Sequence, residues 1–324
     1  MKTAIKSTGS VTETVMKGPN EPKPKLNFKK RFMRDYFGYI YVLPVLLGIV
    51  IFTLYPMGLS MYYSLHDYKF YVVENQVTNF GFQHYISIFT NNWPGVSHSL
   101  WITARFAVLT VSVRLIGSYC LALFLNQQLK GIRVYRVLYY LPCLIPAVAS
   151  TLLWKDITSP DYGFINMMLR ELGLPAYTFY NAKETVLPTI LITGITGWGG
   201  NMIMWLSQMQ NVPTELYESA DLDGANYFQK VFKITIPMTM SVLFYLLMTG
   251  IIGALQVFEG YYPLRNGICD SEIDFIVMNI YDAAWVSNNY SYACALSWFL
   301  FVIIGIVTIL VFKLNKHIYY AEEA

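Results

Sequence analysis

Four carboxylates lie close together in one polar segment, residues 211–237, between two long apolar runs. They belong to Glu215, Glu218, Asp221 and Asp223. The segment is much longer than the roughly 2–8 residues usual between bundled helices, so we expect it to have structure of its own. One interpretation is an amphipathic hairpin resting on lipid headgroups. Anionic lipids would repel the carboxylates, which favours a protein partner, but both interpretations stay open at this point.

The same segment contains signals for two short helices. Pro213 suits the first position of a helix, and Gly224 can end that helix in a left-handed conformation. Asp223 could instead cap a second short helix, over about residues 225–233. Pro237 then opens the next apolar run. We therefore expect two short helices folded back at a membrane surface.

Catalytic and metal-binding chemistry has no comparable pattern in the sequence. The four histidines are scattered, without an HExxH motif or a pair at i, i+4, so we expect no zinc site. No GxxxxGK[ST] phosphate loop occurs, so the chain should not hydrolyse ATP. No spacing of Ser, His and Asp suggests a triad. The four cysteines include no CxxC pair, and we expect free thiols. We predict no catalytic residue, no metal and no cofactor bound by this chain.

The composition is that of a membrane protein. The 324 residues have a mean hydropathy of +0.40, with 55% hydrophobic and 13% charged residues, against about 25% charged in ordinary soluble domains. This excludes a disordered chain, a basic nucleic-acid-binding domain and an ordinary soluble enzyme. A bilayer core needs about 20 apolar residues as helix. Six apolar runs are near this length: 39–63, 100–125, 137–154, 186–206, 237–258 and 292–312.

The distribution of basic residues predicts the orientation. With a cytoplasmic amino terminus, sixteen of the 23 Lys and Arg residues fall on the cytoplasmic side and five on the other, while Arg105 and Arg114 lie within the second run. Positive charge favours the cytoplasmic side. We therefore expect an all-α, polytopic membrane protein with six transmembrane helices and both termini cytoplasmic. Residues 1–38 should be a disordered basic tail, 39–316 the transmembrane domain with its loop at 207–236, and 317–324 a cytoplasmic tail.

The acidic segment resembles the EAA loop of binding-protein-dependent ABC importer permeases, whose pattern is Glu-Ala-Ala-x-x-x-Gly followed by Ile-x-Leu-Pro. Ser219 and Ile236 are mild departures from that pattern. Segments 79–89, 123–126 and 160–166 also resemble carbohydrate permeases of the maltose and glycerol-phosphate type. The residues matching the first part of the loop, which we take as ATPase-coupling candidates, are Glu218, Ser219, Ala220, Asp223, Gly224 and Ala225.

The resemblance implies a set of partners. In that family the loop is a coupling helix that docks in a cleft of a cytoplasmic ATP-hydrolysing subunit. Glu218 would meet polar groups there, Ala220 would pack closely and Gly224 would permit the turn between the helices. Two such ATPase subunits would use ATP and Mg. A second related permease, a heterodimer being favoured, and an extracytoplasmic solute-binding protein would complete the assembly in the bacterial plasma membrane.

Polar and aromatic residues of the fourth and fifth runs are candidates for a substrate path. Sugars are held by hydrogen bonds together with an aromatic platform, and in the maltose-type relatives the sugar contacts come from these two spans. The alternative is that small and polar residues pack helix against helix. The candidates are Trp198, Asn201, Gln256, Glu259 and Tyr262.

The two arginines of the second run need partners, because an arginine in mid-membrane costs at least about 2.5–3.5 kcal/mol on insertion scales. We expect Arg105 to reach outward from the external end. Arg114 should face the bundle and pair with a carboxylate or helix-end carbonyls, with anion binding as the functional alternative.

These observations together predict the permease subunit of an ATP-driven carbohydrate importer. The alternative from another class is a self-contained secondary transporter or channel. That would require inverted repeats or a paired intramembrane carboxylate, and the sequence shows neither. A mono- or oligosaccharide, a polyol, a uronate and glycerol phosphate are all compatible as substrate, and no nucleic-acid partner is expected.

Overall fold

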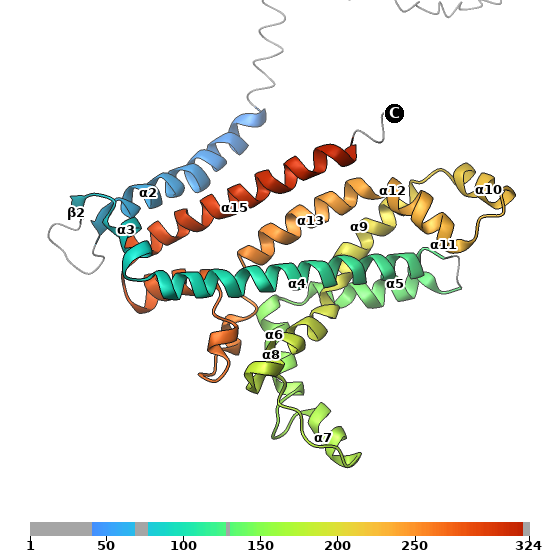
Figure 1. Ribbon diagram of the computed structural model, residues 1–324, viewed down its shortest axis with the longest axis horizontal. Coiled ribbons are helices and arrows are strands. Elements are labelled where there is room, and N and C mark those ends of the chain that lie inside the picture. The colour runs from blue at the N-terminus through green and yellow to red at the C-terminus, as the bar shows by residue number, and fades with distance from the viewer. Residues whose placement is uncertain (1–40, 69–76, 128–129, 320–324) are drawn as a thin grey trace, which may run out of the picture. The chain divides into compact units, whose positions relative to one another are not determined.

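The computed structural model describes residues 41–68, 77–127 and 130–319, which are almost entirely helical (Figure 1). The chain divides into two compact units, with the boundary between Gly58 and Leu59. The basic tail predicted for residues 1–38 lies outside the described residues, as do residues 320–324 at the other end.

Four helices are long and apolar enough to cross a membrane, and they overlap the first, second, fourth and sixth predicted runs. The third run is a bent pair, Ile132–Leu144 with Ala147–Ile157, bent by 98°. The fifth run lies mostly in the second member of another bent pair, Tyr227–Met238 with Met240–Leu255, bent by 65°. The described residues thus provide four continuous spans, or up to six if each bent pair counts as one. The continuous helical runs are Tyr41–Ser64, Trp93–Leu125, Lys183–Gln210 and Tyr290–Lys313.

Individual elements are shorter than these runs, because π and 3-10 turns interrupt several of them. The two strands are β1 (His66–Tyr68) and β2 (Val77–Phe80). The α-helices are α2 (Tyr55–Ser64), α3 (Gln83–Thr90), α4 (Trp93–Leu125), α5 (Ile132–Tyr140), α6 (Ala147–Ile157), α7 (Phe164–Glu171), α8 (Lys183–Thr193), α9 (Trp198–Gln210), α10 (Thr214–Leu222), α11 (Tyr227–Lys230), α12 (Ile236–Met238), α13 (Met240–Leu255), α14 (Ile276–Tyr281) and α15 (Tyr290–Tyr319).

Two expectations about the elements need correction. The fold is not purely α-helical, since β1 and β2 pair antiparallel, with Asp67 opposite Thr78. Backbone groups outside helices still need hydrogen-bond partners, and the short ladder supplies them here. The third run is not one straight span. Pro146 precedes α6, and because proline lacks an N–H and clashes with the preceding turn, the helix breaks there.

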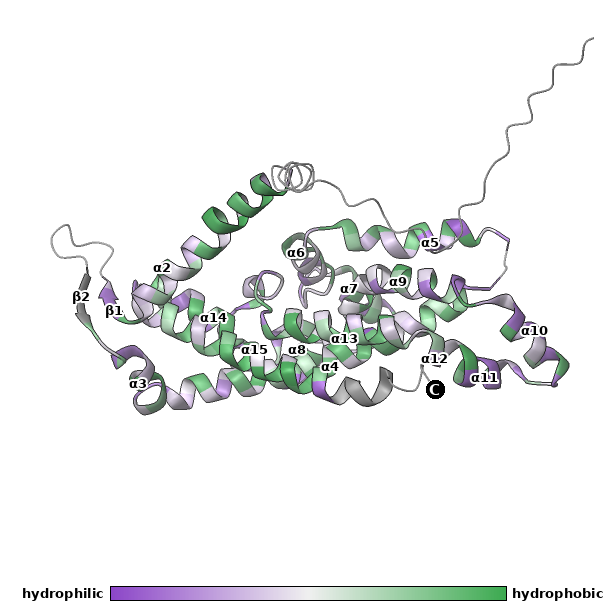
Figure 2. Ribbon diagram, turned by 90° about the horizontal axis from the view of Figure 1, so that it is seen from above, coloured by the Kyte–Doolittle hydropathy of each residue, from purple (hydrophilic) through white to green (hydrophobic). Residues whose placement is uncertain are grey.

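The core of the second unit forms where α4 packs against both α9 and α13. Trp205 of α9 is fully buried in this cluster. Its indole nitrogen donates to Ser118 Oγ at 3.2 Å, and its ring lies edge-on to Tyr119 with centroids 4.8 Å apart. The indole N–H thus keeps a partner inside an apolar contact. Figure 2 shows the apolar character of α4, α13 and α15, in contrast to the more polar α10 and α11.

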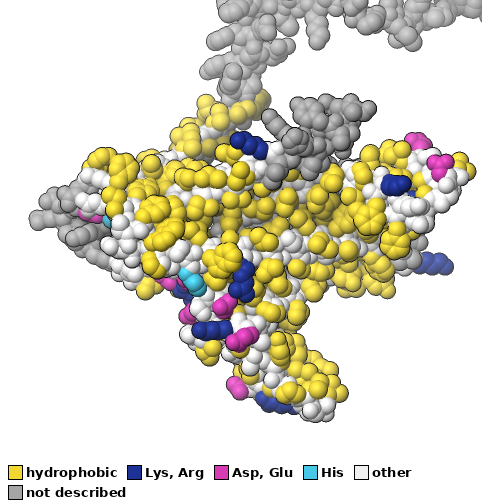
Figure 3. Space-filling view, viewed as in Figure 1, with side chains coloured by type: hydrophobic (Ala, Val, Ile, Leu, Met, Phe, Trp, Pro, Cys, Tyr) yellow, Lys and Arg dark blue, Asp and Glu magenta, His cyan; other side chains and the backbone are white. Residues whose placement is uncertain are grey.

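One end of this unit collects segments that are far apart in the sequence. The carboxyl end of α4, the start of α5 and the helices α10 and α11 lie together there in both views (Figures 1 and 2). In Figure 3 charged side chains gather at this end and around α7, while hydrophobic side chains cover most of the face between them. The polar segment of residues 211–236 is therefore at an end of the helical unit and not along its side.

Candidate functional site

The polar segment of residues 211–236, called the elbow from here on, is a pair of short helices. The first, α10, follows Pro213 and ends at Gly224, whose φ of +73° is left-handed. The Ala225 N–H donates to Ala220 O at 2.9 Å and the Gly224 N–H donates to Asp221 O at 3.1 Å. This is the Schellman arrangement, which requires a left-handed residue where Gly224 stands. The predicted helix stop at Gly224 is confirmed.

The second arm is capped three residues beyond the predicted cap, Asp223. Asp223 is the C-cap residue of α10, and Asn226 instead caps α11. Asn226 Oδ1 accepts from the Gln229 N–H at 2.9 Å, and Gln229 Oε1 accepts from the Asn226 N–H at 2.7 Å. These reciprocal bonds form a capping box, which satisfies two otherwise free backbone donors. The arm continues through a π turn, Val231–Thr235, into α12.

Contacts between the two arms hold the elbow in one shape. The hydroxyls of Tyr217 and Thr235 are 3.0 Å apart, and Lys230 forms an ion pair with Asp221. At the base, Gln208 Nε2 donates to Met238 O at 3.2 Å, which joins the end of α9 to α12. Because α9 and α13 leave from its two sides, the elbow is mechanically connected to both helices.

The coupling candidates are presented on the outside of the elbow. Glu218, Ser219 and Asp223 are exposed, while Ala220 and Ala225 are half-buried. Ser219 Oγ donates back to Leu216 O at 3.1 Å. Leu222, at the tip, is 91% exposed. Among the described residues no hydrogen bond or ion pair is formed by the carboxylates of Glu218 and Asp223, which leaves them open to an external partner.

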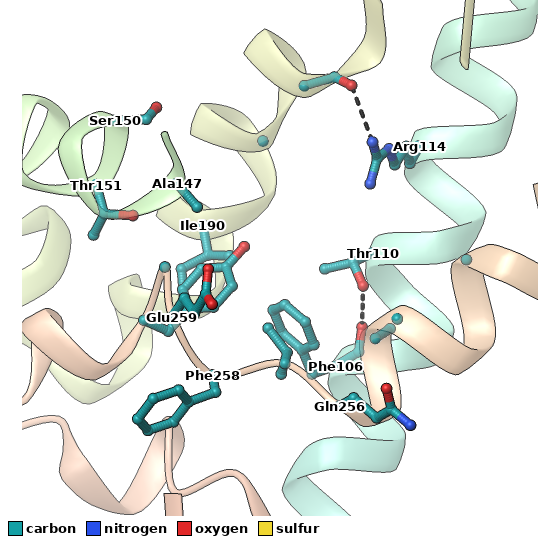
Figure 4. A pocket seen from close by; sticks show the side chains of 18 of the residues that line it. Phe106, Thr110, Arg114, Ala147, Ser150, Thr151, Ile190, Gln256, Phe258 and Glu259 are labelled. Carbon is teal, nitrogen blue, oxygen red and sulfur yellow. Dashed lines mark hydrogen bonds between the residues drawn. The ribbon is translucent and has the colours of Figure 1, made fainter. Parts of the chain in front are cut away.

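A large cavity lies in the same unit, at the far ends of α9 and α13 from the elbow. Its volume is about 1330 Å³, and Trp198, Gln256 and Glu259 line it, as shown in part in Figure 4. These three substrate-path candidates are thus brought together. Asn201 and Tyr262 are not among the lining residues. The Tyr262 ring instead lies 5.5 Å from the Arg265 guanidinium, outside the cavity.

Arg114, for which the sequence left anion binding open as a function, also lines the cavity, but several other lining residues were not singled out from the sequence. Phe106, Thr110 and Arg114 come from one face of α4, at i, i+4 and i+8, a spacing that places them on one side of a helix. That periodicity beside a mid-span arginine was the signal available in the sequence. Others come from α6, in the bent pair of the third run, and from the segment before α8. No local pattern in the sequence marks these residues: Ser150, Thr151, Trp154 and Tyr180.

The two arginines of α4 have different surroundings. Arg105 pairs with Glu272 through Nη1 and Oε2, 3.4 Å apart. Arg114 lines the cavity, and its Nη2 donates to Gly197 O at 3.3 Å. The expected helix-end carbonyl is therefore present for Arg114, while no carboxylate among the described residues pairs with it.

The segment between α13 and α15 is fixed by charge. Arg265 donates to Asp274 Oδ1 at 2.9 Å and also to Asp282, and Ser99 of α4 donates to Asp274 Oδ2 at 2.7 Å. Burial acts to lower the pKa of the Arg265 guanidinium, but the hydrogen bonds and charges of Asp282 and Asp274 outweigh it and raise that pKa overall. The four cysteines are free, as the sequence predicts.

The chain is similar to proteins that are named as transport permeases. Residues 115–319 match the family model for the binding-protein-dependent transport system inner membrane component. The chain is 29% identical over 287 residues to the probable ABC transporter permease protein YesP of Bacillus subtilis, covering 86% of this chain and 90% of that protein. It is 27% identical over 297 residues to the trehalose/maltose transport system permease protein MalF of Thermococcus litoralis, covering 90% and 97%.

Solved structures show the same architecture. A crystal structure of a bacterial ABC transporter involved in the import of the acidic polysaccharide alginate matches with a TM-score of 0.78 and 25% identity, covering 89% of this chain and 98% of that one. The alginate transporter in complex with an alginate pentasaccharide-bound periplasmic protein matches with a TM-score of 0.80, over 90% and 98%. The family match covers the elbow and most of the cavity-lining helices. The chain is therefore a multi-pass membrane protein that belongs to the family of binding-protein-dependent transport system inner membrane components.

Proposed function

We propose that this chain is a permease subunit of an ATP-driven ABC importer that carries a saccharide or related polyol into the cytoplasm. The observation that carries the proposal is the elbow, an exposed pair of short helices with acidic residues. The elbow contains the residues that match the family's motif. Relatives named for trehalose/maltose and arabinooligosaccharide transport support a saccharide as substrate. ATP and Mg would be used by the partner subunits and not by this chain.

The proposed topology has six spans with both termini cytoplasmic, each bent pair counting as one. This topology is supported by the position of basic residues at the end of the helical unit where the elbow lies. The first turns of α5 carry Arg133 and Arg136, and the start of α5 lies at the same end of the unit as the elbow (Figure 1). Basic residues favour the cytoplasmic side of short loops, so this end is assigned to the cytoplasm.

The elbow would move as a rigid body and would transmit the movement of an ATPase subunit to the membrane helices. Glu218, Ser219, Ala220, Asp223, Gly224 and Ala225 form the proposed contact with an ATPase subunit. An apolar side chain as exposed as Leu222, flanked by carboxylates, suits a partner's cleft better than anionic lipid. Because the arms are joined by the Tyr217–Thr235 contact, a push on the elbow would move α9 and α13, which end at the cavity.

The remaining partners follow from the same proposal. Two ATPase subunits would bind the elbows of two related permeases, of which this chain supplies one, and the pair is proposed to be a heterodimer. A solute-binding protein would deliver the substrate from outside. The structure of the alginate transporter in complex with an alginate pentasaccharide-bound periplasmic protein supports such a partner.

The test is charge reversal on the elbow. Glu218→Lys should abolish saccharide uptake in cells that carry the complete transport system, because it places a cation where the motif presents a carboxylate. Membrane insertion should be unchanged, since Glu218 is exposed and bonds to no described residue. The measurement is uptake of labelled saccharide, with the amount of chain in the membrane fraction determined in parallel.

A matched control is Glu171→Lys, the same change at an exposed position in the last turn of α7. That variant should transport at close to the wild-type rate. Normal uptake by Glu218→Lys would contradict the proposed coupling, and so would uptake by the chain alone in vesicles without ATPase subunits.

A further inference from the structure

Arg114 keeps most of its hydrogen-bonding capacity unused. A guanidinium offers five N–H donors and stays charged at any physiological pH. Among the described residues, Arg114 makes one side-chain hydrogen bond, to Gly197 O at 3.3 Å, and no ion pair. An arginine in a membrane helix is costly and usually marks a pairing or a pathway. Its position at the cavity wall makes the pathway the better explanation.

The neighbouring contact places an aromatic ring beside the guanidinium. Gly117 lies one turn beyond Arg114 on α4, and a Cβ at Gly117 would come within 2.2 Å of the Trp198 ring. The ring therefore occupies the space that the missing side chain leaves. Since Arg114 binds the carbonyl of Gly197, which precedes Trp198, the cation and the ring are held next to each other at the cavity wall.

The acidic group of the cavity does not neutralise this cation. Glu259 lies across the cavity from Arg114 in Figure 4, and no ion pair joins the two. Gln256 is also set apart from Arg114 in that view. The cavity thus has a cation beside an aromatic ring on one side and the carboxylate of Glu259 across from it, which would orient an asymmetric ligand.

We infer that Arg114 and Trp198 form a subsite for an anionic saccharide, most simply a uronate. The guanidinium accepts a carboxylate through paired N–H bonds, a geometry that arginine matches well. The pyranose ring would pack its apolar face against the indole, and hydroxyl groups would donate to Glu259. A sugar phosphate offers the same anionic oxygens to Arg114. This inference rests on the proposed function and names the substrate class.

The experiment is a binding titration of the full-length chain in lipid nanodiscs. The probes are trigalacturonate, a neutral galactose trimer of the same linkage, and galactose 6-phosphate. Wild type should bind trigalacturonate at least about tenfold more tightly than the neutral trimer, and Arg114→Gln should lose about 10- to 100-fold for the anionic probe only. Added NaCl should weaken wild-type binding of the anionic probe.

Arg105→Gln is the matched control, because it removes the same charge from the same helix outside the cavity. Arg114→Lys should retain part of the affinity, and the salt series on wild type needs no variant if Arg114→Gln fails to fold. Preference for galactose 6-phosphate over both trimers supports the subsite and assigns the anion as phosphate. Equal wild-type affinity for charged and neutral trimers would overturn the inference, as would equal losses in Arg114→Gln for both or no binding of either anionic probe.

The outcome is separable from that of the proposed function. Cells that take up a neutral saccharide through this system, with a chain that shows no preference for anions, would refute the subsite and leave the importer standing. Loss of uptake in the elbow variant alone bears only on coupling.

Discussion

The elbow and the cavity are built in different ways, although α9 and α13 connect them. The elbow is shaped by local bonds: the helix stop at Gly224 and the cap at Asn226 each involve residues within five positions of one another. The helices around the cavity are placed by close approach of distant segments, as where Gly199 of α9 meets Tyr139 of α5 beside the cavity. A change in the elbow should therefore alter coupling with little effect on folding, whereas a change where these helices touch should disturb packing first.

The strongest test of this difference is Gly199→Ala. A Cβ there would lie 2.2 Å from the carbonyl oxygen of Tyr139, a backbone atom that cannot rotate away, so α5 and α9 would have to separate. We expect the free energy of unfolding to fall by about 3 kcal/mol, which is the upper end of the usual cost of overpacking a core. The measurement is the thermal midpoint of the purified chain by fluorescence-detected size exclusion.

The adjacent Gly200→Ala is the control, because no heavy atom lies within 4 Å of its added Cβ. It should keep the wild-type midpoint. Equal midpoints for both variants would show that the α5–α9 contact is looser than described.

Gly117→Ala should have the second-largest effect. The new methyl group would displace the Trp198 ring and so disturb the cavity wall. This overpacking should lower the free energy of unfolding by about 2 kcal/mol. We expect a clear loss of uptake. In a double-mutant cycle, Gly117→Ala should add little once Trp198→Ala has removed the ring. Simple additivity of the two changes would contradict the contact.

Gly224→Ala should have a smaller effect, confined to the elbow. The residue has a φ of +73° and open space around it, so only backbone strain opposes a side chain, about 1 kcal/mol. Uptake should fall while the thermal midpoint stays near that of wild type. Gly224→Asn should lose less, because Asn tolerates the left-handed conformation. Equal uptake by both variants and wild type would mean that the turn is not required.

Asn226→Ala should have the smallest effect. It removes the side-chain half of the capping box, worth about 0.5–1 kcal/mol at an exposed helix start. Uptake should drop slightly, and Asn226→Ser or Asn226→Asp, which also cap, should restore it. A large fall in the thermal midpoint would show that the elbow contributes to folding more than the local contacts suggest.

The sequence predictions succeeded mostly for features that depend on local sequence, and they failed for features that depend on packing. The four continuous apolar helices and the helix stop at Gly224 were predictable because they depend on composition and on single-residue conformational preference. The cap at Asn226 was missed although the signal, Gln229 three residues later, is local. The 98° bend at the third run was not predicted, since the two prolines there permit several geometries and packing selects one.

By itself the sequence determined that the chain lies in a membrane, where the four continuous apolar helices fall and which segment carries the family's acidic motif. These properties follow from hydrophobicity, charge and the φ preferences of individual residues, which act over a few positions. Only the tertiary structure decided that Trp198, Gln256 and Glu259 share one cavity with Arg114, while Asn201 and Tyr262 stay outside it. The physical reason is that a cavity wall depends on which helix faces approach each other, and that is set by steric fit between residues far apart in the chain.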